Sequence, residues 1–376
     1  MNLPEQDIIQ RIESLMQSSH SFALYRLPWT DECILVLQTK DEAEILTDIT
    51  QLNGKQGFVI APFRLSEDHP LMLIRPDILA SGWEAISKAL SYEEENVTLH
   101  SVKRHFTNAK TTLYEQTPQE GLEGYREVFT RFITPLQKRT FQKLVLSRME
   151  TCTLTEEFSP LRAFVKACNS YPRMMIYLCY TPQTGTWLGS TPEILLSGQE
   201  KNWHTVALAG TMPMQGEVMP EEWSDKNKEE QKLVAEYVRR IVKKFGNKLE
   251  EQGPYTARAG QLVHLKSDFR FNLKNKKSLG NLLKELHPTP AVCGLPKEET
   301  YRFIAENEGY ERKYYSGFIG WLDSEGQTDL YVNLRCMEIN DGKATLYAGG
   351  GILPSSEMAL EYEETKEKMK TMKNIL

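Results

Sequence analysis

Two residues have the types and the sequence surroundings for acid–base chemistry. Lys143 lies in Phe141–Met149, where alternating residues are typical of a strand, and it shares a face with Val145. At the edge of a sheet such a lysine prevents aggregation, whereas on an inner face burial favours the neutral amine, which can act as a base. Glu193 stands between Pro192 and an apolar run. It either caps a turn in solvent or is a buried acid that can donate a proton.

Three acidic residues on two predicted helices could hold a cation. Glu361 and Glu364 share one face of the last helix with Lys368. Their carboxylates would repel each other unless a cation lies between them, although an ordinary charged surface helix is the alternative. Glu230 lies on or beside the apolar stripe of the helix that begins at Ser224. It either offsets the helix dipole or points into the fold toward a partner or a metal, and carboxylate oxygens suit Mg²⁺.

Other residues could bind an anion or line a cavity. Arg335 falls inside the predicted strand Asp329–Ile339, where an arginine needs a carboxylate partner. The run Gly349-Gly350-Gly351 exposes backbone N–H groups that could form an anion-binding nest. Gly210 and Thr211 form a small-residue turn at which a ligand could approach the backbone. His264 is a lone histidine, and such a residue is more often structural than catalytic.

A proline-rich loop with the sequence HPTPAVCGLPKE spans His287 to Glu298 and contains Ala291. Its prolines exclude a helix interior and a central strand, because each removes a backbone donor and restricts the residue before it. The apolar residues among them suggest a fixed wall of a cavity, with an ordinary buried connection as the alternative.

The elements that must position these residues form an irregular series of strands and helices. Such a series, without regular alternation, indicates an α+β fold. Residues 1–110 read as a helix followed by short strands that supply part of a sandwich, and a helical pattern runs from Tyr114 to Leu136. Residues 246–281 form a polar region that is broken by Leu262–Leu265, and its lysine cluster reads as a solvated loop. A three-strand meander is predicted at Gly317–Leu322, Asp329–Ile339 and Ala344–Tyr347.

Composition limits the classes of protein to consider. The 376 residues are 40% hydrophobic and 26% charged, which is ordinary for a globular protein, and the net charge of −6 gives no general affinity for nucleic acid or membrane. No membrane span or signal peptide is apparent. The six cysteines show no CxxC pairing, so we expect buried thiols in a reducing cytoplasm.

From about Tyr125 to the C-terminus, the sequence resembles the chorismate-utilising enzymes. This family includes isochorismate synthases, salicylate synthases, anthranilate synthase large components and aminodeoxychorismate synthases. The motifs that carry the resemblance are FQKLVLSR, GSTPEILL, LAGT, SDKNKEEQKLV, VHL, HPTPAVCGLPK, YYSGFIG, VNLRC and AGGGILPSSEMALEYEET. The resemblance implies two packed antiparallel-rich sheets with helices outside. Residues 1–110 would be the N-terminal part of the sandwich and residues 111–376 the chorismate-binding catalytic region of one integrated fold.

The resemblance also implies roles for individual residues. Lys143 would activate water for attack at ring carbon 2 of chorismate, and Glu193 would protonate the departing hydroxyl at carbon 4. Mg²⁺ would hold the ring carboxylate, bound by Glu230, Glu361 and Glu364. Arg335 would grip the enolpyruvyl carboxylate. The other expected substrate-binding residues are Gly210, Thr211, His264, Ala291, Tyr315, Gly349, Gly350 and Lys368.

Two positions indicate which member of the family the chain resembles. The aminating relatives lack the lysine at position 143, and Ala291 cannot form a covalent adduct. An isochorismate synthase, with menaquinone or siderophore synthesis as its pathway, is therefore expected. A salicylate synthase and a non-catalytic chorismate-binding protein are the alternatives. The family implies a monomer without a glutamine amidotransferase subunit. Asn227 and Gln231 depart from the acidic residue and the histidine that are frequent in the family, and this puts the fine metal geometry in doubt.

Overall fold

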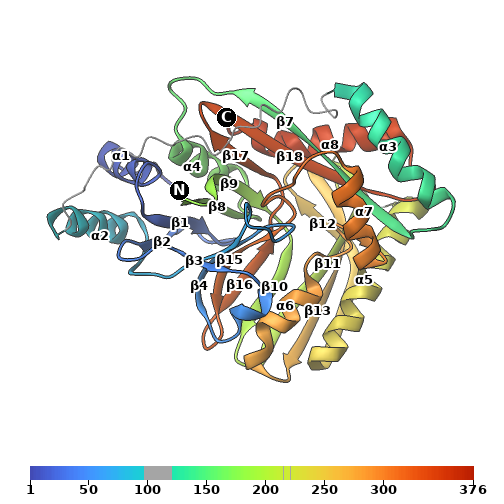
Figure 1. Ribbon diagram of the computed structural model, residues 1–376, viewed down its shortest axis with the longest axis horizontal. Helices are drawn as coiled ribbons and strands as arrows, with labels where there is room; N and C mark the ends of the chain where they lie inside the picture. Colours follow the sequence, from blue (N-terminus) through green and yellow to red (C-terminus); the bar gives the residue numbers. More distant parts are fainter. Residues whose placement is uncertain (97–120, 215, 221) are drawn as a thin grey trace.

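Two nine-stranded sheets pack against each other, with helices on the outer faces (Figure 1). The computed structural model describes residues 1–96, 121–214, 216–220 and 222–376. The sheets are antiparallel in every strand pairing that these residues form, and the prediction of an α+β fold with two packed antiparallel sheets is confirmed. The predicted boundary between residues 110 and 111 and the helix start at Tyr114 lie outside the described residues.

The first sheet has the strand order β14-β7-β18-β17-β9-β8-β1-β2-β6. Its strands, in that order, are Gly294–Leu295, Lys143–Thr153, Lys343–Ile352, Cys336–Asn340, Gly185–Thr191, Met175–Thr181, Ser21–Arg26, Ile34–Gln38 and Ile78–Ser81. The second sheet has the order β12-β13-β11-β10-β16-β15-β4-β5-β3. Its strands are Gly246–Ala259, Leu262–Leu273, Asn202–Pro213, Ile194–Gln199, Thr328–Val332, Phe318–Asp323, Gln56–Ala61, Leu71–Ile74 and Glu44–Leu46.

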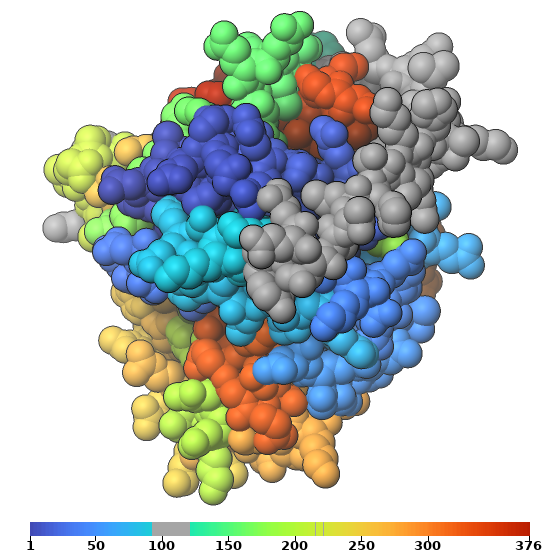
Figure 2. Space-filling model, turned by 90° about the vertical axis from the view of Figure 1, so that its left-hand side faces the viewer, coloured from blue at the N-terminus to red at the C-terminus, as the bar shows by residue number. Residues whose placement is uncertain are grey.

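Strands from the N-terminal part of the chain belong to both sheets. β1, β2 and β6 extend the first sheet beyond β8, while β3, β4 and β5 extend the second beyond β15. A cluster of buried aromatic and aliphatic side chains fills the space between the sheets and includes Phe58, Ile60, Tyr177, Trp187 and Ile319. Figure 2 shows residues 1–96, in blue and cyan, on one face of the molecule beside segments from the C-terminal part in orange and red.

The helices cover the outer faces because each buries an apolar stripe. The α-helices are α1 Gln6–Leu15, α2 Trp83–Asn96, α3 Gly121–Gln137, α4 Pro160–Ser170, α5 Asp225–Phe245, α6 Leu279–Leu286, α7 Lys297–Asn307 and α8 Met358–Lys373; η1 Ile49–Leu52 and η2 Lys276–Ser278 are short 3₁₀ turns. Helices α1, α2 and α4 pack on the first sheet, and α5 and α6 pack on the second. Helices α3 and α7 cover the start of β7.

Helix α5 shows how local sequence fixes the position of a site residue. The Ser224 side chain accepts a hydrogen bond from the Asn227 backbone N–H at 3.2 Å and so caps the first turn. Val234, Val238 and Ile241 then place the apolar stripe on the second sheet. Glu230 is buried on the same helix at 7% exposure, so its carboxylate points into the fold rather than into solvent.

The predicted three-strand meander is wrong. The segment Asp329–Ile339 is divided between β16 in the second sheet and β17 in the first. Arg335 has a φ of +47° in the crossing between them, which is uncommon for a residue other than glycine. Asn333 holds the crossing, because its amide donates to the Tyr314 carbonyl at 2.8 Å and accepts from the Tyr177 hydroxyl at 2.6 Å. These are tertiary contacts that no alternating pattern reveals.

Residues 246–281 contain more regular structure than their polar sequence indicated. Strands β12 and β13 form a long hairpin there, paired from Gly246 with Leu273 to Ala259 with Leu262. Strand β12 is the outermost strand of its sheet and is mostly exposed, so its sequence lacks an apolar face although its backbone is paired. The six cysteines are all unpaired, as expected. No helix of the described part of the chain is long and apolar enough to span a membrane.

Candidate active site

The predicted site residues come together at one end of the sandwich, around a cavity between the ends of β11, β13 and β18 and helices α5 and α8. Eleven of the fourteen line this cavity: Glu193, Gly210, Thr211, Glu230, His264, Ala291, Tyr315, Arg335, Gly349, Gly350 and Lys368. The other three, Lys143, Glu361 and Glu364, lie directly behind its wall, in contact with Gly350, Gly351 or Lys368.

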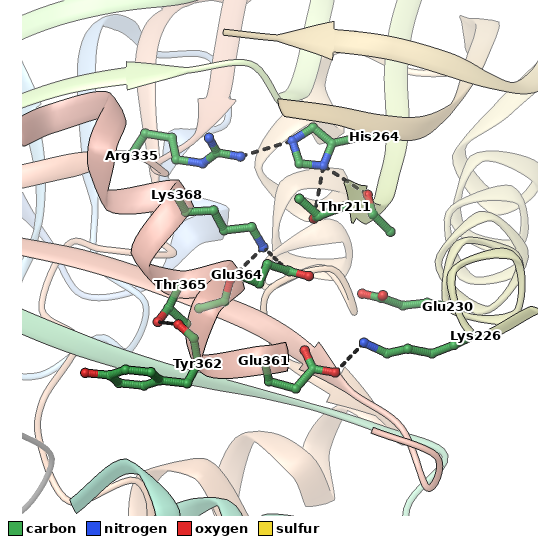
Figure 3. A network of polar contacts seen from close by, with 12 residues as sticks. Thr211, Lys226, Glu230, His264, Arg335, Glu361, Tyr362, Glu364, Thr365 and Lys368 are labelled. Carbon is green, nitrogen blue, oxygen red and sulfur yellow. Dashed lines mark hydrogen bonds and ion pairs between the residues drawn. The ribbon is translucent and has the colours of Figure 1, made fainter. Parts of the chain in front are cut away.

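Glu230, Glu361 and Glu364 form a group that we call the acidic cluster, and each member is paired with a lysine. Figure 3 shows the pairs that Lys226 forms with Glu361 and Lys368 with Glu364. The Lys143 Nζ lies 3.0 Å from Glu230 Oε1, and the Lys368 Nζ lies 2.6 Å from Glu364 Oε1. Lys226, on the first turn of α5, forms an ion pair with Glu361. Each carboxylate of the cluster thus has an ammonium group beside it, in a largely buried region.

Lys143 is completely buried at the start of β7, with β14 on one side of the strand and β18 on the other. The solvent-exposed edge position is therefore excluded for it. Its contact with Glu230 is an ion pair without the angles of a hydrogen bond, and its Nζ has no hydrogen-bond partner among the described residues. Burial and the neighbouring lysines act on Glu230 in opposite directions, and the lysines prevail, so the pKa of Glu230 is lowered.

The glycine run at the end of β18 provides space for these side chains. None of the three glycines is in the left-handed region; they are extended and pair with β7, so the predicted nest does not form. A Cβ on Gly351 would lie 2.1 Å from Glu230 Oε1, and one on Gly350 would lie 3.2 Å from Glu364 Oε1 and 3.3 Å from Glu361 Oε2. Pairing with β17 ends at Leu346, which leaves the glycine segment unpaired on one side, toward the cavity.

Glu193 lies in the turn between β9 and β10 and is 2% exposed. The hydrogen bond that Glu193 donates to Thr191 Oγ1 comes from its backbone, and its carboxyl group forms no hydrogen bond or ion pair with the residues that the structure describes. Burial raises the pKa of Glu193 to about 8, against a partial lowering by the positive charges of Lys143, Lys368 and Arg335. The group is therefore protonated at neutral pH and can donate a proton into the cavity.

Arg335 is 4% exposed and has no carboxylate partner among the described residues, contrary to the expectation for a buried arginine. Its guanidinium instead donates to His264 Nε2 at 3.0 Å. His264 Nδ1 donates to the Gly210 carbonyl at 3.0 Å, which leaves Nε2 unprotonated in the neutral ring, as an acceptor. Burial, and then Arg335, lower the pKa of His264 well below its ordinary value, so the ring is neutral at neutral pH.

These contacts leave Arg335 oriented but without a counter-ion. Burial lowers its pKa to about 10, so the guanidinium remains charged at neutral pH. A buried, uncompensated guanidinium that lines a cavity is suited to bind the carboxylate of a ligand. Stacked rings of Tyr315 and Tyr347, 5.5 Å apart at 13°, form the neighbouring wall.

The acidic cluster has the donor chemistry of a Mg²⁺ site. Glu361 is 2% exposed, and its Oε2 has no hydrogen-bond partner among the described residues. Burial raises the pKa of Glu361 to about 7, and the neighbouring charge of Glu364 adds to the increase while Lys226 opposes it. Within the described ranges, no three acidic, histidine or cysteine side chains already converge on one metal position, since each carboxylate is turned to its lysine. Carboxylate oxygens are the ligands that Mg²⁺ prefers, and these carboxylates would have to turn from their lysines to bind it.

Sequence reasoning missed two parts of the site. Nothing in the sequence indicated that Lys226 belongs to the site, because a lysine in the first turn of a charged helix is ordinary. The second part is a buried ion pair between Glu308 and Arg312, with Arg312 Nη2 2.6 Å from Glu308 Oε1. Arg312 also donates to the carbonyls of Val145 on β7 at 2.9 Å and Val292 in the proline loop at 2.7 Å. It therefore fixes the strand that carries Lys143 against the loop.

The two departures from the family pattern have structural roles. The Gln231 amide donates to Ser267 Oγ on β13 at 2.8 Å. Asn227 packs against Gly210, where a Cβ would lie 3.1 Å from the Asn227 Cβ. Gln231 is thus hydrogen-bonded to a neighbouring strand of the second sheet rather than to the acidic cluster.

Comparison with known proteins gives matches along almost the whole chain. Residues 6–376 match a family described as chorismate binding enzyme. The chain is 31% identical over 252 residues to the salicylate biosynthesis isochorismate synthase of Pseudomonas aeruginosa, covering 65% of this chain and 52% of that one. It is 31% identical over 274 residues to the isochorismate synthase DhbC of Bacillus subtilis, covering 69% of each chain.

A solved structure shows the same fold. MenF, the menaquinone-specific isochorismate synthase from Escherichia coli, has a TM-score of 0.75 at 20% identity, over 96% of this chain and 89% of that one. The chain spans about half the length of the first of the two curated relatives.

Proposed function

The chain belongs to the chorismate-binding enzymes, and we propose that it is a Mg²⁺-dependent isochorismate synthase. The reaction would isomerise chorismate by adding a water oxygen at ring carbon 2 and releasing the hydroxyl at carbon 4. The observation that carries the proposal is Glu193, a buried carboxyl group without a partner, whose pKa of about 8 keeps it protonated beside the cavity. Such a group is a general acid for a departing hydroxyl.

The substrate would be held by its two carboxylates. Arg335, charged and without a carboxylate partner, would take the enolpyruvyl carboxylate, with its orientation fixed by His264. Glu230, Glu361 and Glu364 would hold Mg²⁺, which when bound would neutralise the ring carboxylate and fix its position. Ala291, Gly349 and Gly350 would leave room for the ring against the cavity wall.

Lys143 and Glu193 would then divide the proton transfers. Lys143 would accept a proton from the attacking water as its oxygen bonds to carbon 2. The ring double bonds shift, the bond from carbon 4 to its oxygen breaks, and Glu193 gives its proton to the hydroxyl, which leaves as water. Lys143 afterwards releases a proton and Glu193 regains one, so the net reaction is an isomerisation.

Lys143 forms an ion pair with Glu230, and an amine can act as a base only when it is not protonated. If Glu230 served as a metal ligand, the fully buried amine would lose its counter-ion. A buried amine without a counter-ion favours the neutral form. The proposed mechanism therefore requires Glu230 to change partner before Lys143 can accept a proton.

The direct test is to incubate the purified protein with chorismate and Mg²⁺, without glutamine or ammonia, and to separate the products by chromatography. Isochorismate should appear, and EDTA should stop its formation. Salicylate together with pyruvate would instead indicate the salicylate synthase alternative. Binding of chorismate without turnover would refute the enzymatic proposal.

We assign the reaction to menaquinone synthesis, although siderophore synthesis draws on the same product. The curated relatives include enzymes of several isochorismate-dependent pathways, so the assignment needs a test in cells. Deletion of the gene should abolish menaquinone and leave catecholate production unchanged. Loss of catecholates with menaquinone intact would refute this assignment while leaving the reaction unaffected.

A further inference from the structure

Lys226 contacts the acidic cluster but has no part in the proton transfers proposed above. We infer that Lys226 is the internal counter-ion of the cluster, that it competes with Mg²⁺ for Glu361, and that it thereby sets the metal affinity of the site. The inference rests on the metal site of the proposed function and assigns a role to a residue outside the proposed ligand set.

The position of Lys226 follows from the helix that carries it. It lies on the first turn of α5, four residues before Glu230, so both side chains extend from the same face of the helix. Its ammonium group reaches across to α8 and forms an ion pair with Glu361. Figure 3 shows the Lys226 side chain beside Glu230, with its nitrogen directed at the Glu361 carboxylate.

All three carboxylates of the cluster attract this ammonium group. Lys226 forms an ion pair with Glu361 on α8 and lies on the same face of α5 as Glu230. Its ammonium group therefore lies in a region of negative potential. This is also the region in which the carboxylates would bind a divalent cation.

Although Lys226 contacts Glu361, one carboxylate oxygen of the cluster has no hydrogen-bond partner in the part of the chain that the structure describes. Glu361 is 2% exposed, and its second carboxylate oxygen, Oε2, has no hydrogen-bond partner among the described residues. A buried carboxylate oxygen without a partner is costly and is rarely left so without a reason. The oxygen lies next to Gly350, as does Glu364 Oε1, so the two oxygens border one small space. A metal ion there would contact an oxygen that Lys226 does not satisfy.

Among the three lysines of the cluster, Lys226 is the one that can withdraw most easily. Its side chain is 22% exposed, whereas that of Lys143 is 0% exposed and that of Lys368 is 13% exposed. Lys368 is also held by the Gly349 carbonyl at 2.8 Å. A long, partly exposed side chain can move its ammonium group into water when a divalent cation takes its place.

Two opposite effects follow from removal of the Lys226 charge. Without metal, the three carboxylates lose one of their counter-ions, so the folded protein should be less stable. With metal, Mg²⁺ no longer competes with an ammonium group, so it should bind more tightly. A residue that only packed against α8 would produce the first effect without the second.

The test is calorimetric titration of the full-length protein with MgCl₂ in the absence of chorismate. Lys226→Met keeps most of the side-chain volume and removes the charge, and it should lower the dissociation constant for Mg²⁺ by about tenfold, within the usual range of coupling between sites. Lys232→Met is the matched control, because Lys232 lies on the same helix, is 73% exposed and is 4.0 Å from Glu236. The control should bind Mg²⁺ as the wild type does.

Thermal unfolding of the same proteins provides a second measurement. Without Mg²⁺, Lys226→Met should unfold at a lower temperature than the wild type, and saturating Mg²⁺ should stabilise it more than it stabilises the wild type. If Lys226→Met cannot be purified without metal, Lys226→Gln provides the same comparison. Equal or weaker Mg²⁺ binding by the variant would overturn the role of Lys226 alone. Absence of Mg²⁺ binding in the wild type would overturn both this role and the proposed metal site.

Discussion

Substitution of Glu193 by glutamine should increase stability while removing activity. In the folded protein the Glu193 carboxyl has a pKa of about 8, compared with an ordinary value of 4.5. Between these two pH values the folded protein keeps a proton that the unfolded chain releases. The free energy of unfolding therefore falls by about 1.4 kcal/mol for each pH unit through this range. Glutamine has a similar shape and no such proton, so the free energy of unfolding of Glu193→Gln does not fall with pH for this reason.

The size of the effect follows from the two pKa values. The gain in stability of Glu193→Gln over the wild type should be near zero at about pH 4, about 3 kcal/mol at pH 7, and about 5 kcal/mol above pH 8. The same substitution removes the general acid, so kcat should fall by about 10²- to 10⁴-fold. In the wild type, kcat/KM should decline above about pH 8, where Glu193 in the free enzyme loses its proton.

Urea unfolding over the range from about pH 5 to about pH 8, in EDTA, measures the first effect. The matched control is Glu299→Gln, which makes the same change at an exposed position on α7 and should show no stability gain that grows with pH. If the wild type and Glu193→Gln lost stability in parallel as the pH rises, Glu193 would not be protonated in the folded protein. Its assignment as the acid would then fail.

Three further substitutions test the geometry of the site. Lys143→Ala should reduce isochorismate formation by about 10²- to 10⁴-fold without loss of the fold, as judged by circular dichroism; full activity would refute its role as the base. Gly351→Ala should weaken Mg²⁺ binding more than Gly350→Ala, because its Cβ would lie 2.1 Å rather than 3.2 Å from the nearest carboxylate oxygen; calorimetry showing the reverse order would contradict the geometry. Arg312→Met should lower stability in urea by about 3–5 kcal/mol because it removes the positive partner of the buried ion pair with Glu308, and unchanged stability would contradict that pairing.

Local sequence patterns predicted the structure correctly where a residue's neighbours along the chain also determine its environment in the fold. The alternation in Phe141–Met149 predicts the strand that carries Lys143, and the apolar period after Ser224 predicts the helix that carries Glu230. The resemblance to the chorismate-utilising enzymes then predicted which of these positions face one cavity. Periodicity alone did not determine whether Lys143 and Glu193 are buried or exposed to solvent.

Sequence reasoning failed where long-range contacts override local preference. The bend at Arg335 depends on Asn333 and its bonds to Tyr177 and Tyr314, so the segment looked like one continuous strand. Strand β12 looked like loop because an exposed edge strand is specified by its partner β13 and not by its own apolar residues.

The contact between Lys226 and Glu361 could not be predicted from the sequence for a related reason. The two residues are 135 positions apart in the sequence and lie on different helices. Each belongs to a helix end rich in charged residues, where an exposed position is the ordinary expectation. Only the packing of α5 and α8 around the end of β18 shows that the two charges meet inside the protein.

The central claim is that Lys143 activates a water molecule whose oxygen becomes the new hydroxyl at carbon 2, while Glu193 releases the old one from carbon 4. The most direct test is mass spectrometry of isochorismate formed from unlabelled chorismate in H₂¹⁸O with Mg²⁺. Each product molecule formed in the forward reaction should carry one ¹⁸O atom, located in the hydroxyl at carbon 2. Isochorismate without ¹⁸O would show that the original hydroxyl moves within the substrate, and would contradict the roles of both residues.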